Sequence, residues 1–181
     1  NLDFVAPKIH KASFTRKNIA YQVVETEDKL FQLKHALSKN PGSSIIYVRN
    51  RRATKDISNY LEAQGFSSTF YHGGITNKEK NERLQFWLSE QKLIMVATTA
   101  FGMGIDKPNV KNVIHYNLPE SLESYYQEAG RAGRNGQSAN AIILKQNIDE
   151  EHLKNQFLST LPSTDYVKNI YKKLCNYFQI A

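Results

Sequence analysis

Short apolar runs rich in β-branched residues alternate along the chain with longer segments in which apolar residues recur every three or four positions. The short runs predict strands, and because several of them are apolar throughout, these strands are expected to be covered on both faces. Helices that join successive strands of this kind produce a mainly parallel sheet. The expected strands are 21–24, 44–48, 69–71, 93–97, 113–116 and 141–144.

Four helical segments are expected between the strands. The second should end at Gly65, the third should begin with a capping box formed by Thr76 and Glu79, and the fourth, over 121–128, should end before Gly130. The apolar stripes of the first three are Leu30, Leu33 and Leu37; Ala53, Ile57, Tyr60 and Leu61; and Leu84, Trp87 and Leu88.

The alternation of strands and helices stops at about Asp149, and two further helices are expected after it. We therefore predict an α/β fold with a mainly parallel sheet of five or six strands. The expected domains are a linker over 1–20, a lobe over 21–146 and a helical tail over 147–181 that leads into another module. The last helix carries on one face Val167, Ile170, Tyr171, Leu174 and Phe178.

The 181-residue chain has 24 Lys and Arg against 17 Asp and Glu, which gives a formal net charge of +7. This surplus only weakly favours a polyanionic partner, because many other proteins carry as much. The positions of the charges are more informative than their sum. Basic residues gather at Lys8, Lys11, Arg16 and Lys17, at Arg49, Arg51, Arg52 and Lys55, and at Arg131 and Arg134, whereas acids gather over 25–28 and 149–151.

Cys175 is the single cysteine of the sequence, which excludes an internal disulfide and any zinc site built on two of these residues. This usage favours an intracellular, cytoplasmic protein. No apolar run reaches the about 18 to 20 residues of a membrane span, and the first residues lack the pattern of a signal peptide. Because the chain starts at Asn1 rather than at Met, we expect it to be part of a longer protein.

The segment 127–136 interleaves three glycines with two arginines, directly after a short predicted helix. Glycine leaves the backbone free of Cβ atoms, and the guanidinium groups of Arg131 and Arg134 are expected to project from one loop. Such groups suit phosphate oxygens. The alternative is a surface turn with incidental arginines.

The segment 96–108 begins as a strand, continues through two threonines, and reaches Asp106 by way of Gly102 and Gly104. Ligands bind at the carboxyl edge of open α/β sheets, so the hydroxyls and backbone N–H groups of this segment are candidates for holding a phosphate. Asp106 is a candidate acceptor for a ribose hydroxyl. The alternative is a loop in which Asp106 only caps a turn.

Taken together, these two segments resemble motifs V and VI of superfamily 2 helicases. Residues 100–110 (AFGMGIDKPNV), 124–136 (SYYQEAGRAGRNG) and 13–19 (SFTRKNI) resemble the RecQ family of DNA helicases. The resemblance covers about residues 10–145 and concerns the second RecA-like lobe with the linker before it, which implies a RecA-like three-layer α/β/α fold. Lys17 stands where the family usually has proline, which makes the linker less stiff.

The resemblance implies ATP and Mg²⁺ as cofactors, held mainly by a first RecA-like lobe of the same polypeptide. Arg131 and Arg134 would contact the γ-phosphate, where a cation that arrives as two lobes close can raise the rate by roughly 10³ to 10⁵. Gln127 would lie near the same phosphates, Gly104 near the nucleotide and Asp106 near the ribose. None of them would be a general base.

The resemblance also implies contacts to the backbone of single-stranded DNA, which would be salt-sensitive and independent of base identity. Asn50 is a good N-cap for the helix after its strand, so a phosphate is expected on that helix N-terminus beside Arg51. A cap with solvated arginines is the alternative. His72 and Gly73 resemble the family's backbone-gripping segment, with Thr98 as a further phosphate contact, although His72 is as readily a structural residue.

Two other motif-like strings are rejected. Residues 149–152 (DEEH) spell a DExH-like box, but a genuine Mg²⁺-binding box would follow a strand of the first lobe, so Asn147 and the three acids more simply cap a helix. Residues 130–138 superficially resemble a phosphate loop, yet they lack its lysine and its glycine spacing.

The sequence contains no Walker A motif, so it holds only half of a nucleotide site, and we expect the isolated chain not to hydrolyse ATP. As part of a complete protein, the resemblance implies ATP-driven 3′–5′ translocation on single-stranded DNA and duplex unwinding, in DNA repair and recombination. An RNA-directed helicase and a catalytically silent nucleic-acid-binding module are the alternatives. A membrane partner is not expected.

RecQ proteins usually follow this lobe with a helical module that binds zinc through four cysteines. With Cys175 alone, either the ligands lie beyond Ala181 or the protein belongs to a zinc-free branch, which the apolar stripe of the last predicted helix favours. Cys175 itself is expected to be a core residue rather than a nucleophile.

Overall fold

The computed structural model describes residues 15–102, 104–157 and 161–178. The strands in these ranges are β1 (Ile19–Glu25), β2 (Ser44–Tyr47), β3 (Ser68–Tyr71), β4 (Ile94–Ala97), β5 (Asn112–His115) and β6 (Ala139–Lys145). The helices are α1 (Lys29–Lys39), α2 (Arg51–Ala63), α3 (Asn77–Leu88), α4 (Leu122–Ala129), α5 (Asn147–Phe157) and α6 (Thr164–Phe178). Every predicted strand is present, with ends within two residues of the prediction.

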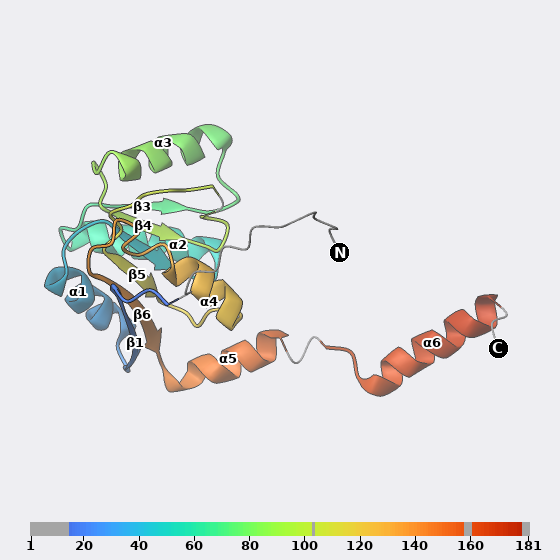
Figure 1. Ribbon diagram of the computed structural model, residues 1–181. Helices are drawn as coiled ribbons and strands as arrows, with labels where there is room; N and C mark the ends of the chain where they lie inside the picture. Colours follow the sequence, from blue (N-terminus) through green and yellow to red (C-terminus); the bar gives the residue numbers. More distant parts are fainter. Residues whose placement is uncertain (1–14, 103, 158–160, 179–181) are drawn as a thin grey trace, which may run out of the picture.

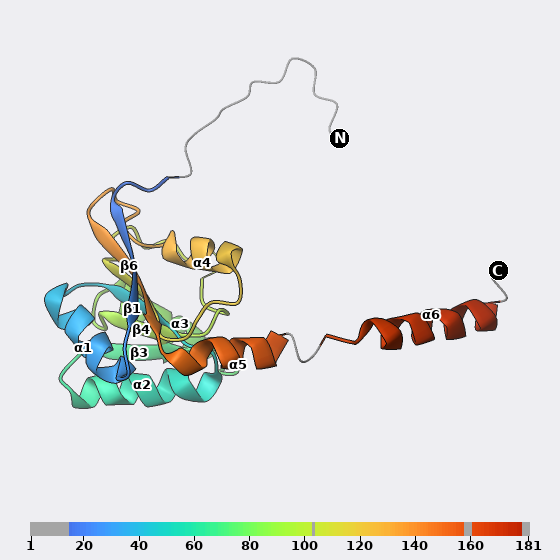
Figure 2. The ribbon, with the colours of Figure 1, turned by 90° about the horizontal axis from the view of Figure 1, so that it is seen from below.

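The strands form one parallel sheet in the order β1-β6-β5-β2-β4-β3. Helices α1 and α2 cover one face, and α3 and α4 cover the other (Figures 1 and 2). The predicted three-layer α/β/α architecture with a parallel sheet is therefore confirmed.

Two apolar cores lie between these layers. On one face Met95 and Phe101 pack with Trp87 of α3, and on the other face Leu33 of α1 and Leu61 of α2 pack on the sheet. All residues of β2, β4 and β5 are buried, because helices cover both faces of these central strands.

Local signals determine the helix ends as the sequence predicts. The Asn50 side chain accepts a hydrogen bond from the Ala53 N–H group at 2.8 Å and caps α2. Thr76 and Glu79 form a capping box at the start of α3. Gly65 follows α2 with φ of +84°, a left-handed conformation that glycine adopts without strain.

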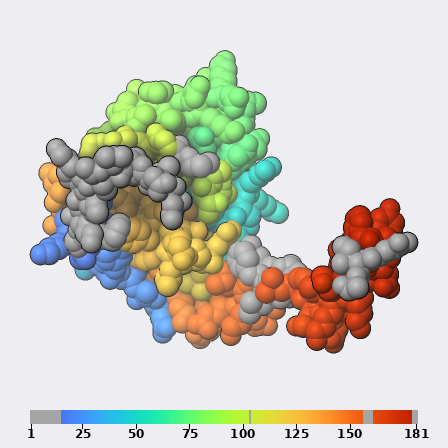
Figure 3. Space-filling model, turned by 45° about the vertical axis from the view of Figure 1, so that its right-hand side comes forward, coloured from blue at the N-terminus to red at the C-terminus, as the bar shows by residue number. Residues whose placement is uncertain are grey.

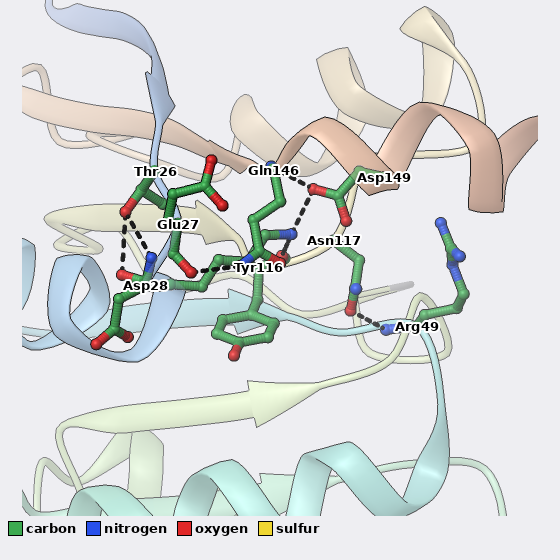
Figure 4. A network of polar contacts seen from close by, with 9 residues as sticks. Thr26, Glu27, Asp28, Arg49, Tyr116, Asn117, Gln146 and Asp149 are labelled. Atoms are coloured by element: carbon green, nitrogen blue, oxygen red, sulfur yellow. Dashed lines mark hydrogen bonds and ion pairs between the residues drawn. The ribbon is translucent and has the colours of Figure 1, made fainter.

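A buried polar network ties α5 to the lobe at its first turn (Figure 4). The Lys29 ammonium group, at the start of α1, lies 2.6 Å from the Asp149 carboxylate and donates to the Tyr116 carbonyl at 2.6 Å. Asp149 also accepts from the Gln146 N–H group at 2.7 Å, so an acid caps this helix as predicted. Asn147 is the first residue of the helix rather than part of its cap, so this part of the prediction is wrong.

Helix α6 stands apart from the lobe (Figures 1 and 3), and none of its residues is buried. The predicted helix is present, but Val167, Ile170 and Leu174 of its apolar stripe are exposed, since no residue in the described ranges covers them. The prediction that this stripe packs, with Cys175 in a core, is wrong for this structure, in which Cys175 is partly exposed. None of the helices described is long and apolar enough to cross a membrane.

Candidate functional site

The two glycine-containing segments meet on the side of the sheet that α3 and α4 cover, toward the amino ends of the strands, where the Gly133 N–H group donates to the carbonyl of Val110 just before β5. One is the loop after β4, over 98–111, and the other is the arginine loop, over 130–137, which follows α4. Arg131 Nη1 donates to the Gly102 carbonyl at 2.7 Å, and Arg134 Nη1 donates to the Asp106 carboxylate at 2.6 Å. The structure therefore brings together two segments that the sequence predicts to act on one ligand.

Arg131 lies tightly over Gly102. A Cβ atom at Gly102 would lie 2.2 Å from Nη2 of Arg131, and φ of Gly102 is +142°, so this position requires glycine. The Nε atom of Arg131 is buried and makes no hydrogen bond to the described residues. A buried N–H group without an acceptor is costly, which leaves this donor for a ligand or a water molecule.

Arg134 is more exposed than Arg131 and is paired. Its side chain is 35% exposed, and that of Asp106 is 78% exposed. Both guanidinium groups have partners in the structure. That of Arg131 lies on a backbone carbonyl and that of Arg134 on a carboxylate, and both acceptors belong to the loop after β4. Gly104, in the same loop, and Gln127, in the last turn of α4, are exposed.

A buried polar cluster lies next to these loops, and sequence reasoning missed it. His115 Nε2, at the end of β5, lies 2.8 Å from the Glu128 carboxylate of α4, and both residues are buried. The His115 ring stacks on Tyr47 with centroids 5.3 Å apart. The Tyr47 hydroxyl donates to the Phe101 carbonyl at 3.2 Å, and burial raises the pKa of this hydroxyl, which keeps it a donor.

No local pattern in the sequence could have revealed this cluster. His115 and Glu128 are 13 residues apart and lie on a strand and a helix, so no helical or strand period relates them. Arg16 and Asn18, which donate to carbonyls of the arginine loop, were missed in the same way. The only available signal was their place within segments that resemble the family.

The residues predicted to contact nucleic acid follow three neighbouring strands. β4 lies between β2 and β3 in the sheet, so the loops after these strands are adjacent. A Cβ atom at Gly74 would lie 2.9 Å from Nη1 of Arg51, and the Thr98 N–H group donates to the Tyr71 carbonyl at 3.3 Å. The carboxyl edge of the sheet thus gathers all of the residues predicted to contact nucleic acid, Asn50, Arg51, His72, Gly73 and Thr98.

His72 has a defined hydrogen-bonding state. Its Nδ1 atom accepts from the Gly74 N–H group at 3.1 Å, which places the proton of the neutral ring on Nε2. Burial lowers the pKa of His72, and the positive charges of Arg51 and Arg83 lower it further. His72 is therefore a neutral ring near pH 7, structurally fixed through Nδ1 and able to donate from Nε2.

The donor set at the arginine loop suits phosphate better than a metal ion. Guanidinium and N–H groups dominate it, and the Asp106 carboxylate is already paired with Arg134. Among the residues that the structure describes, no group of three or more His, Cys, Asp and Glu side chains could hold a metal ion. The residues present fit the phosphate side of a nucleotide, with no place of their own for Mg²⁺.

Comparison with known proteins gives the family. The model of the helicase conserved C-terminal domain matches residues 27–136. A RecQ ATP-dependent DNA helicase of Pasteurella multocida is 37% identical over 150 residues, which are 82% of this chain and 24% of that protein. A putative ATP-dependent DNA helicase Q1 of Caenorhabditis elegans is 40% identical over 141 residues, 74% of this chain and 22% of that protein. The chain spans about a quarter of the length of these curated relatives.

Solved structures share the fold. The yeast DEAD-box splicing factor Prp28 matches with a TM-score of 0.70 and 22% identity, over 80% of this chain and 33% of that one. The E. coli DEAD-box protein SrmB matches with a TM-score of 0.67 and 25% identity, over 82% of this chain and 89% of that one. These likenesses support a RecA-like lobe. The chain belongs to the helicase conserved C-terminal domain family and is the C-terminal RecA-like lobe of a RecQ-family helicase.

Proposed function

We propose that this chain is the C-terminal motor lobe of an ATP-dependent 3′–5′ DNA helicase, in which Arg131 and Arg134 act on the γ-phosphate of ATP held by a first lobe. The observation that carries the proposal is the convergence of the arginine loop and the loop after β4, which the hydrogen bonds of Arg131 and Arg134 join. ATP, when bound, supplies the phosphoryl transfer that drives movement along DNA.

The contacts of the two arginines support this role. Within the part of the chain that the structure describes, Arg131 has a buried Nε without an acceptor, and its Nη1 atom donates to a neutral carbonyl. A phosphate group offers both donors a charge-assisted, bidentate partner, which is stronger than a carbonyl. Arg134 would exchange the exposed Asp106 carboxylate for a phosphate oxygen. Because both side chains approach from the second lobe, hydrolysis would depend on closure of the two lobes.

The proposed contacts to single-stranded DNA lie at the neighbouring strand ends. The N–H groups at the start of α2 and the cation of Arg51 favour a phosphate, and His72 adds the N–H group of Nε2. Thr98 begins the loop that continues to Gly102 and Asp106. One loop therefore joins the proposed DNA contacts to the proposed nucleotide contacts, which offers a direct route for coupling DNA binding to ATP hydrolysis.

The test replaces the two arginines in the helicase that contains this chain together with its first lobe. Arg131→Ala and Arg134→Ala should each lower the kcat of DNA-stimulated ATP hydrolysis by roughly 10³-fold or more. Arg52→Ala, an exposed arginine paired with Asp56 on α2, is the matched control and should retain activity. Unchanged hydrolysis in both variants would instead favour a catalytically silent nucleic-acid-binding module.

An RNA-directed helicase is the second candidate, because contacts to phosphates do not distinguish the two sugars. The names of the relatives, which are DNA helicases, favour DNA. Stimulation of ATP hydrolysis by single-stranded DNA, compared with RNA of the same length and sequence, separates the two. Stronger stimulation by RNA would reverse the assignment.

A further inference from the structure

Arg16, in the segment before β1, holds the arginine loop from outside. Its Nη1 atom donates to the Gly130 carbonyl at 3.2 Å, and its Nη2 atom donates to the carbonyls of Ala132 at 3.1 Å and Gly133 at 2.8 Å. The guanidinium group therefore spans three carbonyls in a stretch of four residues. The bonds join residues more than a hundred positions apart in the chain, so they reflect tertiary structure and not local geometry.

Asn18 holds the same loop at a second point. Its Nδ2 atom donates to the carbonyls of Gly133 at 2.7 Å and Gln137 at 2.8 Å. Gly133 has φ of +54°, and a Cβ atom there would lie 2.5 Å from Asn18 Nδ2, so the loop fits closely around this side chain. The Asn18 carbonyl accepts from the Ala139 N–H group at 2.9 Å, which fixes Asn18 where β1 and β6 begin to pair.

These acceptors are the peptide groups that carry the two arginines. The Gly130 carbonyl belongs to the peptide bond that leads into Arg131, and the Gly133 carbonyl belongs to the one that leads into Arg134. Hydrogen bonds from a guanidinium group are charge-assisted, and its planar fork fixes the direction of each bond. The side chain of Arg16 thus sets the orientation of both peptide planes from which the guanidinium groups extend.

We propose that Arg16 and Asn18 are positioning residues that preset Arg131 and Arg134, and that the segment leading into β1 controls through them how the arginines present themselves to phosphate. The inference rests on the proposed role of the arginines. A displacement of reacting groups by about 1 Å can lower a rate by roughly 10²-fold. Five hydrogen bonds that hold the arginine loop against such a displacement would therefore help to maintain the rate of hydrolysis. Any shift of residues 15–18 would move the anchors directly.

The test measures DNA-stimulated ATP hydrolysis by the helicase that contains this chain. Arg16→Ala should lower kcat by about 10- to 100-fold and change the KM for ATP by less than about twofold, because Arg16 does not touch the nucleotide. Arg16→Lys should restore only part of kcat, since an ammonium group cannot reproduce the fork across three carbonyls. Lys17→Ala, an exposed neighbour in the same segment, is the matched control and should retain kcat.

Asn18→Asp provides an isosteric second variant, in which a carboxylate oxygen replaces the donor that faces two carbonyls. It should also lower kcat. Backbone hydrogen exchange separates positioning from unfolding: exchange should become faster over 130–137 and stay unchanged in β2 and β4. If Arg16→Ala also speeds exchange in these central strands, Arg16→Lys and Asn18→Asp decide the question.

The outcomes distinguish this inference from the proposed function. A normal kcat in both Arg16→Lys and Asn18→Asp, when Arg131→Ala abolishes hydrolysis, would overturn the positioning role alone. A normal kcat in Arg131→Ala itself would overturn the role of the arginines, and the positioning inference with it. Loss of kcat in the Arg16 and Asn18 variants as well as in Arg131→Ala, with Lys17→Ala active, supports the inference.

Discussion

Arg134 and Asp106 form an ion pair of 2.6 Å between the arginine loop and the loop after β4, where the nucleotide is proposed to bind. The sequence led us to expect the guanidinium group at a phosphate and the carboxylate at a ribose. In the structure the two side chains bind each other instead. A nucleotide that engages both must separate them. Exposed ion pairs contribute about 0–1 kcal/mol, which a phosphate contact readily exceeds.

Replacement of Asp106 tests its proposed role at the ribose. Asp106→Ala should change the free energy of unfolding by less than about 1 kcal/mol, because the ion pair is exposed. It should raise the KM for ATP by roughly 2- to 10-fold, which is the loss of affinity expected when one hydrogen bond is removed. Steady-state kinetics and urea unfolding measure the two effects. Asp56→Ala, which removes an exposed i,i+4 pair with Arg52, is the control. An unchanged KM in Asp106→Ala would mean that Asp106 only caps a turn.

Substitutions of Asn50 separate its two possible roles, helix cap and DNA contact. Asn50→Ala should lower the free energy of unfolding by about 1 kcal/mol and weaken DNA binding. Asn50→Asp keeps a good cap but brings a negative charge toward the phosphate, so it should retain stability and weaken binding of single-stranded DNA. Asn50→Ser, which caps without charge, is the control. Binding is measured by fluorescence anisotropy at fixed salt, and full affinity in Asn50→Asp would leave Asn50 as a cap only.

Features that depend on near neighbours in the sequence were predictable. The Asn50 cap, the Thr76 and Glu79 capping box and the left-handed Gly65 each involve residues within a few positions of one another. The central strands β2 and β4 were predictable because parallel strands that are buried on both faces are rich in apolar residues. The amphipathic period of α6 predicted a helix correctly, but a period cannot tell which surface, if any, covers the apolar face.

Contacts between distant polar residues could not be predicted from the sequence. Arg131 meets a carbonyl 29 positions away, and Arg16 meets one 117 positions away, through packing that no local pattern encodes. The sequence analysis assigned Arg131 to a phosphate and Asp106 to a ribose only through resemblance. For Arg16 and Asn18 it had only their place in a segment that resembles the family, and no local pattern relates His115 to Glu128.

The lowered pKa of His72 predicts a pH effect on stability. In the unfolded chain this pKa takes its ordinary value of about 6.5, and in the folded chain it is lower. Between the two values the unfolded state binds more protons, so the free energy of unfolding should fall as pH falls through this window. His72→Asn keeps an acceptor for the Gly74 N–H group but does not titrate, so it should lack this part of the pH dependence. Urea unfolding measures the free energy of unfolding of both proteins between about pH 7.5 and 5. The same pH dependence in His72→Asn and in the unchanged chain would contradict the prediction.

The isolated 181-residue chain should not hydrolyse ATP at a rate above a buffer blank. It contains no Walker A lysine to hold the β- and γ-phosphates, and its arginines provide only one side of a site. Phosphate release is measured with and without single-stranded DNA, and the chain with Arg131→Ala serves as the control for contaminating activity. Hydrolysis that DNA stimulates and that Arg131→Ala removes would contradict the half-site interpretation.

The buried pair of Lys29 and Asp149 should anchor α5 to the lobe. Their side chains are only 4% and 7% exposed, so removal of one partner leaves an uncompensated charge in the interior. Lys29→Met should lower the free energy of unfolding by about 3 to 5 kcal/mol, and the double variant Lys29→Met, Asp149→Leu should recover most of that loss. Lys145→Met, which removes more exposed pairs with Glu25 and Glu150, should lower it by less than about 1 kcal/mol and is the control. Urea unfolding measures all three, and equal losses for Lys29→Met and Lys145→Met would show that the buried pair does not anchor the helix.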